Sequence, residues 1–211
     1  MHKLKAIVLA TALAGASTAA MAAPSVYVGA QLGHQDTAFD VSTSYAGTTY
    51  GESLEGLSIT GIAGGLYMGT KYPVGDSFFL GTELNVGTSA ADHTTRYGVD
   101  SIKLEAGTSY GISALAGKQL SPSTAVYGRL GYQRTEYEMT LSGPGYNESD
   151  DETFGGVRVG VGMETGLGDQ LALRLDWSQT HYSSKTYSNG WVSEAFEPTE
   201  SLFQVGLSYQ F

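Results

Sequence analysis

The chain has 211 residues, no cysteine, 29 glycines and a formal net charge of −10 at pH 7. The lack of cysteine excludes a disulfide framework and a thiolate metal site. The acidic balance excludes a nucleic-acid partner, because binding phosphates needs a basic surface. So much glycine disfavours an all-helical chain, and after the N-terminal segment no apolar run is long enough for a transmembrane helix.

The N-terminal segment predicts a cleaved secretory signal peptide, residues 1–22. Two lysines precede the apolar residues 6–16, and small residues follow in an A-x-A pattern. The residues at the expected cleavage site are Ala20, Ala22 and Ala23. We therefore expect one mature domain, residues 23–211.

Short turn signals at residues 73–76, 121–124 and 168–170 divide the mature chain into four similar units, each expected to be a hairpin. Strands are expected at residues 25–35, 55–72, 77–87, 101–120, 125–139, 154–167, 171–182 and 201–211. Polar loops are expected at residues 36–54, 88–100 and 143–153, and a last loop runs through His181, Trp191 and Glu194 to Ser201. In the strand at 101–120 the apolar residues alternate from Ile102 to Ala114, which predicts a single apolar face.

The last strand has the clearest alternation, with large apolar side chains on one face and small or polar ones on the other. The apolar positions are Phe203, Val205, Leu207, Tyr209 and Phe211. This pattern resembles the closing strand of bacterial outer-membrane barrels. In those proteins the C-terminal aromatic residue and its alternating partners are recognised by the barrel-assembly machinery.

The whole mature chain resembles the small eight-stranded barrels related to the OmpA transmembrane domain and to the OmpX and Ail group. The stretches VYGRLGYQ (126–133) and GLSYQF (206–211) carry most of the similarity. The resemblance implies an all-β, eight-stranded antiparallel up-and-down transmembrane barrel in the outer membrane. It also implies a structural or surface-interaction role without a cofactor, for a monomer that contacts lipid, lipopolysaccharide, the assembly machinery and an extracellular ligand at the loops. A narrow low-conductance channel is the alternative.

Six charged residues lie at similar distances from the short turns, three acidic and three basic. They are Glu83, Arg129, Arg158, Glu164, Arg174 and Asp176. We expect a matched charge network inside a narrow barrel, with Glu164 between Arg129 and Arg174, because buried charges must be paired. The alternative is a solvated charged face.

His181 and Ser183 form an H-x-S pattern that is similar to the motif of the outer-membrane lipid A 3-O-deacylases. There the His is the base, the Ser is the nucleophile and a later Glu, here Glu194, orients the His. Ser184 stands where the family commonly has Asn. Polar residues at the start of a loop are the simpler interpretation. Trp177 and Tyr182 are expected in an interfacial aromatic girdle.

An acidic run in the third loop is the one candidate for a metal site. Its residues are Glu148, Asp150, Asp151 and Glu152. Carboxylates suit calcium or magnesium, but the run lacks the spacing of an EF-hand loop, so a solvated loop is the alternative.

Overall fold

The computed structural model describes residues 24–45, 51–188 and 191–211, and all regular structure in these ranges is β-strand. In the described ranges no helix has the length and apolar character needed to span a membrane. The expected signal peptide and its cleavage residues Ala20, Ala22 and Ala23 lie outside the described residues.

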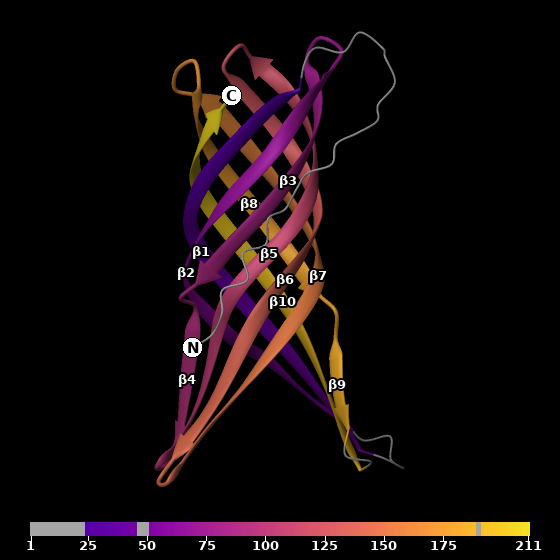
Figure 1. Cartoon of the computed structure of the whole chain (residues 1–211). Helices are drawn as coiled ribbons and strands as arrows, with labels where there is room; N and C mark the ends of the chain where they lie inside the picture. The colour runs from indigo at the N-terminus through magenta and orange to yellow at the C-terminus, as the bar shows by residue number, and fades with distance from the viewer. Residues whose placement is uncertain (1–23, 46–50, 189–190) are drawn as a thin grey trace, which may run out of the picture.

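The strands form one antiparallel sheet that closes on itself (Figure 1). The bounds are β1 (Ser25–Tyr45), β2 (Gly51–Val74), β3 (Phe78–Ser89), β4 (Asp92–Tyr97), β5 (Asp100–Ser121), β6 (Thr124–Gly143), β7 (Tyr146–Gly166), β8 (Leu171–Tyr182), β9 (Lys185–Ser188) and β10 (Val192–Gln210). The order is β1-β10-β8-β7-β6-β5-β3-β2, and pairing of β2 with β1 completes the ring. The eight-stranded ring is confirmed, with β4 and β9 as short additions beyond β3 and β8.

The three short turns lie at one end of the barrel, which we call the short-turn end (Figure 1). Gly75 closes the turn between β2 and β3 with φ +65, a left-handed conformation that glycine adopts without strain. The C-terminus lies at the same end, where the amide of Phe211 donates to the carbonyl of Val26 at 2.9 Å. This bond continues the β1–β10 ladder to the last residue of the chain.

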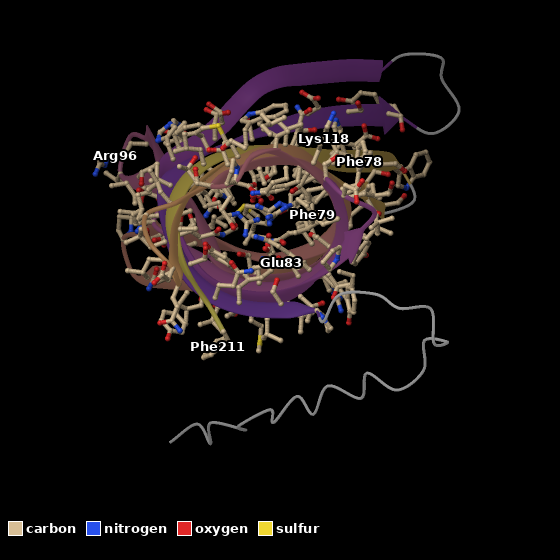
Figure 2. The ribbon with its side chains drawn as sticks, turned by 90° about the horizontal axis from the view of Figure 1, so that it is seen from above. Phe78, Phe79, Glu83, Arg96, Lys118 and Phe211 are labelled. Carbon is tan, nitrogen blue, oxygen red and sulfur yellow. The ribbon has the colours of Figure 1, made fainter. Side chains whose placement is uncertain are left out.

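The outside of the ring is apolar and its inside is small, aromatic or charged. Phe203 and Leu207 of β10 and the following Phe211 are 50%, 53% and 72% exposed, whereas Leu202 and Gln204 are buried. Phe211, Phe78 and Lys118 project outward, and Glu83 points into the ring (Figure 2). An apolar exterior around a polar interior is the opposite of a soluble barrel and is what lipid requires.

Most of the expected polar loops are strands. β1 runs to Tyr45, β4 occupies residues 92–97, and the acidic run lies within β7. The expectation of loops in these segments was wrong, because it took loss of apolar character as the end of a strand. Backbone pairing continues where the side chains are polar, since the ladder satisfies the backbone whatever the side chains are.

At the end opposite the short turns the ring separates into two strand groups that diverge (Figure 1). The β7–β8 ladder ends at the Gly156–Tyr182 pair, and the β2–β3 ladder ends at the Ala63–Ser89 pair. Beyond them, β4 and the outer parts of β5, β6 and β7 form one group, which we call the acidic extension (residues 92–106 and 136–154). β1, β2, β9 and β10 form the second extension.

A β-bulge in β5 changes which face its side chains occupy. Ala106 pairs with Tyr137 but Ser109 pairs with Thr135, so β5 has one more residue than β6 between these pairs. Ala106 is therefore buried inside, whereas Tyr110, beyond the bulge, is 48% exposed on the outside. The single apolar face expected from Ile102 to Ala114 is wrong, because the bulge divides it.

Candidate functional site

Two carboxylates and two guanidinium groups meet at the centre of the lumen. Glu83 accepts from Arg129 at 2.7 Å and from Arg174 at 2.5 Å. Asp176 accepts from the same two arginines at 3.1 and 3.2 Å. All four residues are at most 4% exposed, so each charge lies within reach of opposite charges that offset the cost of its burial.

We call these four residues the central cluster, and tyrosines contact three of them, Glu83, Asp176 and Arg174. The hydroxyl of Tyr27 donates to Glu83 at 2.8 Å, and that of Tyr127 donates to Asp176 at 2.6 Å. The guanidinium carbon of Arg174 lies 4.5 Å from the ring centre of Tyr67 and 4.9 Å from that of Tyr127. Hydrogen bonds and cation–π contacts thus fix the arginine in one orientation.

Glu164 is not between Arg129 and Arg174. Its carboxylate lies 2.5 Å from the amine of Lys71, nearer the short-turn end. The backbone of Glu164 is opposite that of Arg174 in the β7–β8 ladder, but their side chains do not pair. Arg129 is opposite Gly160 and not Glu164. The expectation failed because paired strands of a barrel are staggered, so equal distances from the turns are not equal heights.

Arg158 lies farther from the short-turn end and belongs to a second polar group. Its guanidinium donates to Ser178 at 2.9 Å and to Gln133 at 3.3 Å. Glu200 accepts from Gln35 at 3.1 Å and from Tyr182 at 3.0 Å. Arg158 and Glu200 line the same small polar cavity of about 20 Å³, which is about the room one water needs.

The described lumen therefore holds four acidic and four basic side chains. They are Glu83, Glu164, Asp176 and Glu200, and Lys71, Arg129, Arg158 and Arg174. The six residues expected from the sequence are each at most 9% exposed, so the alternative of a solvated charged face is wrong. Sequence reasoning missed Lys71 and Glu200, which balance Glu164 and Arg158.

An aromatic cluster fills the lumen where the two extensions begin. Tyr137 is its centre, with edge-to-face contacts to Phe39, Phe154 and Tyr182 at ring distances of 5.5, 5.8 and 6.1 Å. Ile59 completes the cluster and is fully buried. Tyr182 points inward, so its expected place in the exterior girdle is wrong, whereas Trp177 is 43% exposed on the outside. The lumen is thus filled by apolar packing in addition to the ion pairs.

His181 and Ser183 are both exposed on the outside of the barrel. No hydrogen bond joins their side chains among the contacts of the described residues. His181 pairs with Thr199 of β10, five positions from Glu194, which corresponds to about 17 Å along the strand. The Glu194 backbone pairs instead with Thr43 of β1 and Tyr187 of β9. The backbone register does not bring Glu194 beside His181.

The acidic run alternates between the two faces of β7. Glu148, Asp150 and Glu152 share one face, and Asp151 lies on the other, opposite Glu138 of β6. Glu152 pairs with Lys185 of β9. In the part of the chain that the structure describes, no group of three or more acidic, histidine or cysteine side chains is arranged to hold a metal ion.

Comparison with known proteins identifies the fold. A search of the curated proteins gave no match. Among solved structures, the outer-membrane protease OmpT of Escherichia coli has a TM-score of 0.56 at 9% identity, over 92% of this chain and 99% of that one. A major outer-membrane protein of Thermus thermophilus has a TM-score of 0.54 at 16% identity, over 86% and 99%. OprG of Pseudomonas aeruginosa has a TM-score of 0.52 at 13% identity, over 89% and 96%.

The model of the outer membrane protein beta-barrel domain matches residues 6–211, nearly the whole chain. This match agrees with the closed ring, the apolar exterior and the charged interior. The chain therefore belongs to the family of outer-membrane protein β-barrel domains and is a protein of the Gram-negative outer membrane.

Proposed function

We propose that this protein is a closed, non-enzymatic barrel with a structural or surface-interaction role in adhesion, resistance or membrane integrity. The two extensions are its interacting parts. The observation that carries this proposal is the length of the strands. At about 3.4 Å per residue and a tilt of about 40°, the 20 residues of β6 rise roughly 50 Å. The hydrocarbon core is only about 30 Å thick, so folded sheet stands well clear of the membrane.

Two features of the lumen support a closed barrel over a narrow channel. The central cluster crosses the lumen with direct ion pairs, and the aromatic cluster fills it farther toward the cell exterior. An ion would have to separate both. We therefore expect no single-channel conductance in planar bilayers.

The site geometry gives little support to the lipid A hydrolase alternative. A Ser nucleophile needs a base within hydrogen-bond reach and a third group that orients the base. His181 and Ser183 share the lipid-facing side, but the Glu194 backbone lies far along β10. We infer that these residues are polar side chains at the outer membrane interface.

The partners that follow from this proposal are outer-membrane lipid and lipopolysaccharide around the barrel, an extracellular ligand at the extensions, and the assembly machinery during insertion. Phe203, Val205, Leu207, Tyr209 and Phe211 are the residues we propose for recognition by that machinery. All five face outward and are 36–72% exposed. The protein is proposed to act as a monomer.

A trimmed barrel tests the proposal. Residues 139–150 are replaced by Asn-Gly, which joins the directly paired Glu138 and Asp151 by a two-residue hairpin turn. Cells with the trimmed protein are expected to keep a folded, heat-modifiable barrel but to lose the surface attachment or the resistance to host factors that the intact protein confers. If the trimmed barrel retains the phenotype in full, the acidic extension does not carry the role, which then belongs to the second extension or to the barrel wall.

A further inference from the structure

The acidic extension has one apolar and one polar face, although it stands outside the membrane. Ile102 and Leu104 of β5 lie directly opposite Leu141 and Met139 of β6, so these four side chains form one patch. Because Ala106 and Tyr137 on the same face point into the aromatic cluster, the patch continues the inner face of the barrel. The residues on the opposite face of the two strands are polar or charged, namely Ser101, Lys103, Glu105, Glu136, Glu138, Thr140 and Ser142.

Burial within the barrel does not explain the outer part of this patch. Ile102, Met139 and Leu141 are 37%, 44% and 39% exposed, while Leu104 alone packs against the aromatic cluster. A strand with water on both faces does not need alternating apolar and polar side chains, whereas a strand with one face packed against a partner does. A contiguous apolar patch rimmed by polar residues marks an interaction surface.

Carboxylates line the β7 side of the patch. Glu148 is opposite Leu141, and Asp150 is opposite Met139, so both share the patch's face. Neither takes part in an ion pair among the described residues, while Glu152 beside them pairs with Lys185. The surface thus offers an apolar stripe with a row of negative charge along one edge.

We propose that this face binds a cationic amphipathic peptide, with its apolar side chains on the Ile102–Leu141 patch and its Lys or Arg side chains on Glu148 and Asp150. This inference rests on the proposed surface role and names its class of partner. A second copy of the chain fits less well, because it would bring an identical acidic row. The outer ends of β5 and β6 are paired, since Ser101 lies opposite Ser142 and their hydroxyl oxygens are 3.0 Å apart, so the face is presented as a formed sheet.

The test uses the full barrel in zwitterionic nanodiscs and a short labelled peptide of alternating Lys and Leu, with empty nanodiscs as the blank. Affinity is measured by fluorescence anisotropy for the intact protein, for E148Q/D150N and for Met139→Ser/Leu141→Ser. The matched control is E138Q/D151N, which removes the same charge from the same hairpin on its outer face. A peptide of alternating Lys and Ser tests the need for apolar contact.

We expect each inner-face variant to weaken binding by about tenfold or more, which is about 1.4 kcal/mol, and the control to stay within about twofold. The Lys-Ser peptide should bind as weakly as the Leu peptide does to Met139→Ser/Leu141→Ser. Equal loss in E148Q/D150N and E138Q/D151N would show unspecific charge attraction and overturn the inference. The inference would also be overturned if the protein formed a dimer that Met139→Ser dissociates and if that dimer did not bind the peptide. Neither result would affect the proposed function, whose surface role is tested by the trimmed barrel and whose closed lumen is tested by conductance.

Discussion

Arg174 on β8 reaches across the lumen to Glu83 on β3, with Nη1 2.5 Å from Oε2 and Nη2 3.3 Å from Oε1. The two strands are not neighbours in the ring, since β7, β6 and β5 lie between them on one side and β10, β1 and β2 on the other. The bidentate pair therefore connects opposite walls of the barrel, and we expect its loss to destabilise the whole ring.

Substitution of Glu83 tests this connection. Glu83→Gln keeps the shape but leaves Arg129 and Arg174 with Asp176 as their only acidic partner in the central cluster. We expect a loss of about 3–5 kcal/mol in the free energy of unfolding, the usual cost of breaking a buried pair. Denaturant unfolding in lipid and the melting temperature of the SDS-resistant form measure it. Glu105→Gln, in a half-exposed pair with Lys103, should cost far less, because water screens an exposed ion pair. Similar losses in both variants would contradict the buried role of Glu83.

A double-mutant cycle tests the Lys71–Glu164 pair. Lys71→Met and Glu164→Gln should each destabilise the barrel, and the double variant should lose less than the sum of the two. We expect a coupling energy of about 1–3 kcal/mol, as for groups in direct contact. The same cycle between Glu164 and Arg129 should give a value near zero. A larger coupling to Arg129 would restore the arrangement expected from the sequence.

Two glycines of the wall should respond in opposite ways to alanine. A Cβ on Gly162 would lie 2.2 Å from Cζ of Tyr127 and would displace a hydroxyl that donates to Asp176. We expect Gly162→Ala to destabilise the barrel by about 1–3 kcal/mol, as overpacking does. Gly128→Ala is the control, because the nearest atom to its Cβ is a carbonyl oxygen 4.0 Å away. It should be neutral or slightly stabilising, and a larger loss there than at Gly162 would refute the packing argument.

The hydrolase alternative predicts a change in lipid A. Lipid A from cells expressing the protein, its His181→Ala variant or an empty vector is compared by mass spectrometry. We expect three identical spectra, because the register does not bring the Glu194 backbone beside His181. Loss of one acyl chain with the intact protein, but not with the variant, would make the protein an enzyme.

The barrel and its faces were predictable from the sequence because lipid imposes a strict period of two. Phe203 to Phe211 alternate without interruption, and all five apolar side chains face outward. Outside the membrane that constraint ends, so the alternation of apolar residues no longer indicated where the strands stop. Tyr45 and Tyr146 end and begin long strands in segments that composition alone assigned to loops.

The sequence predicted that charged side chains of both signs point into the lumen, but not which acidic group pairs with which basic group. Lys71 was missed because glycines 61, 64 and 65 obscure the phase of β2. Glu200 was missed because it was assigned to a loop, although it continues the inward set of Leu202 and Gln204 by two positions. Which carboxylate meets which cation depends on the stagger between strands, and no single strand contains that information.

The extra residue at Gly107–Thr108 has a consequence for how the outer strands can change over evolutionary time. On the short-turn side of the bulge, the even-numbered side chains of β5 face lipid. On the side of the acidic extension, Ile102 and Leu104 are even-numbered too, yet they face inward. One inserted residue thus inverts the parity of everything beyond it. Lineages should gain or lose residues in the acidic extension in twos, while a single deletion at this position would turn its apolar patch to the outside and its charges inward.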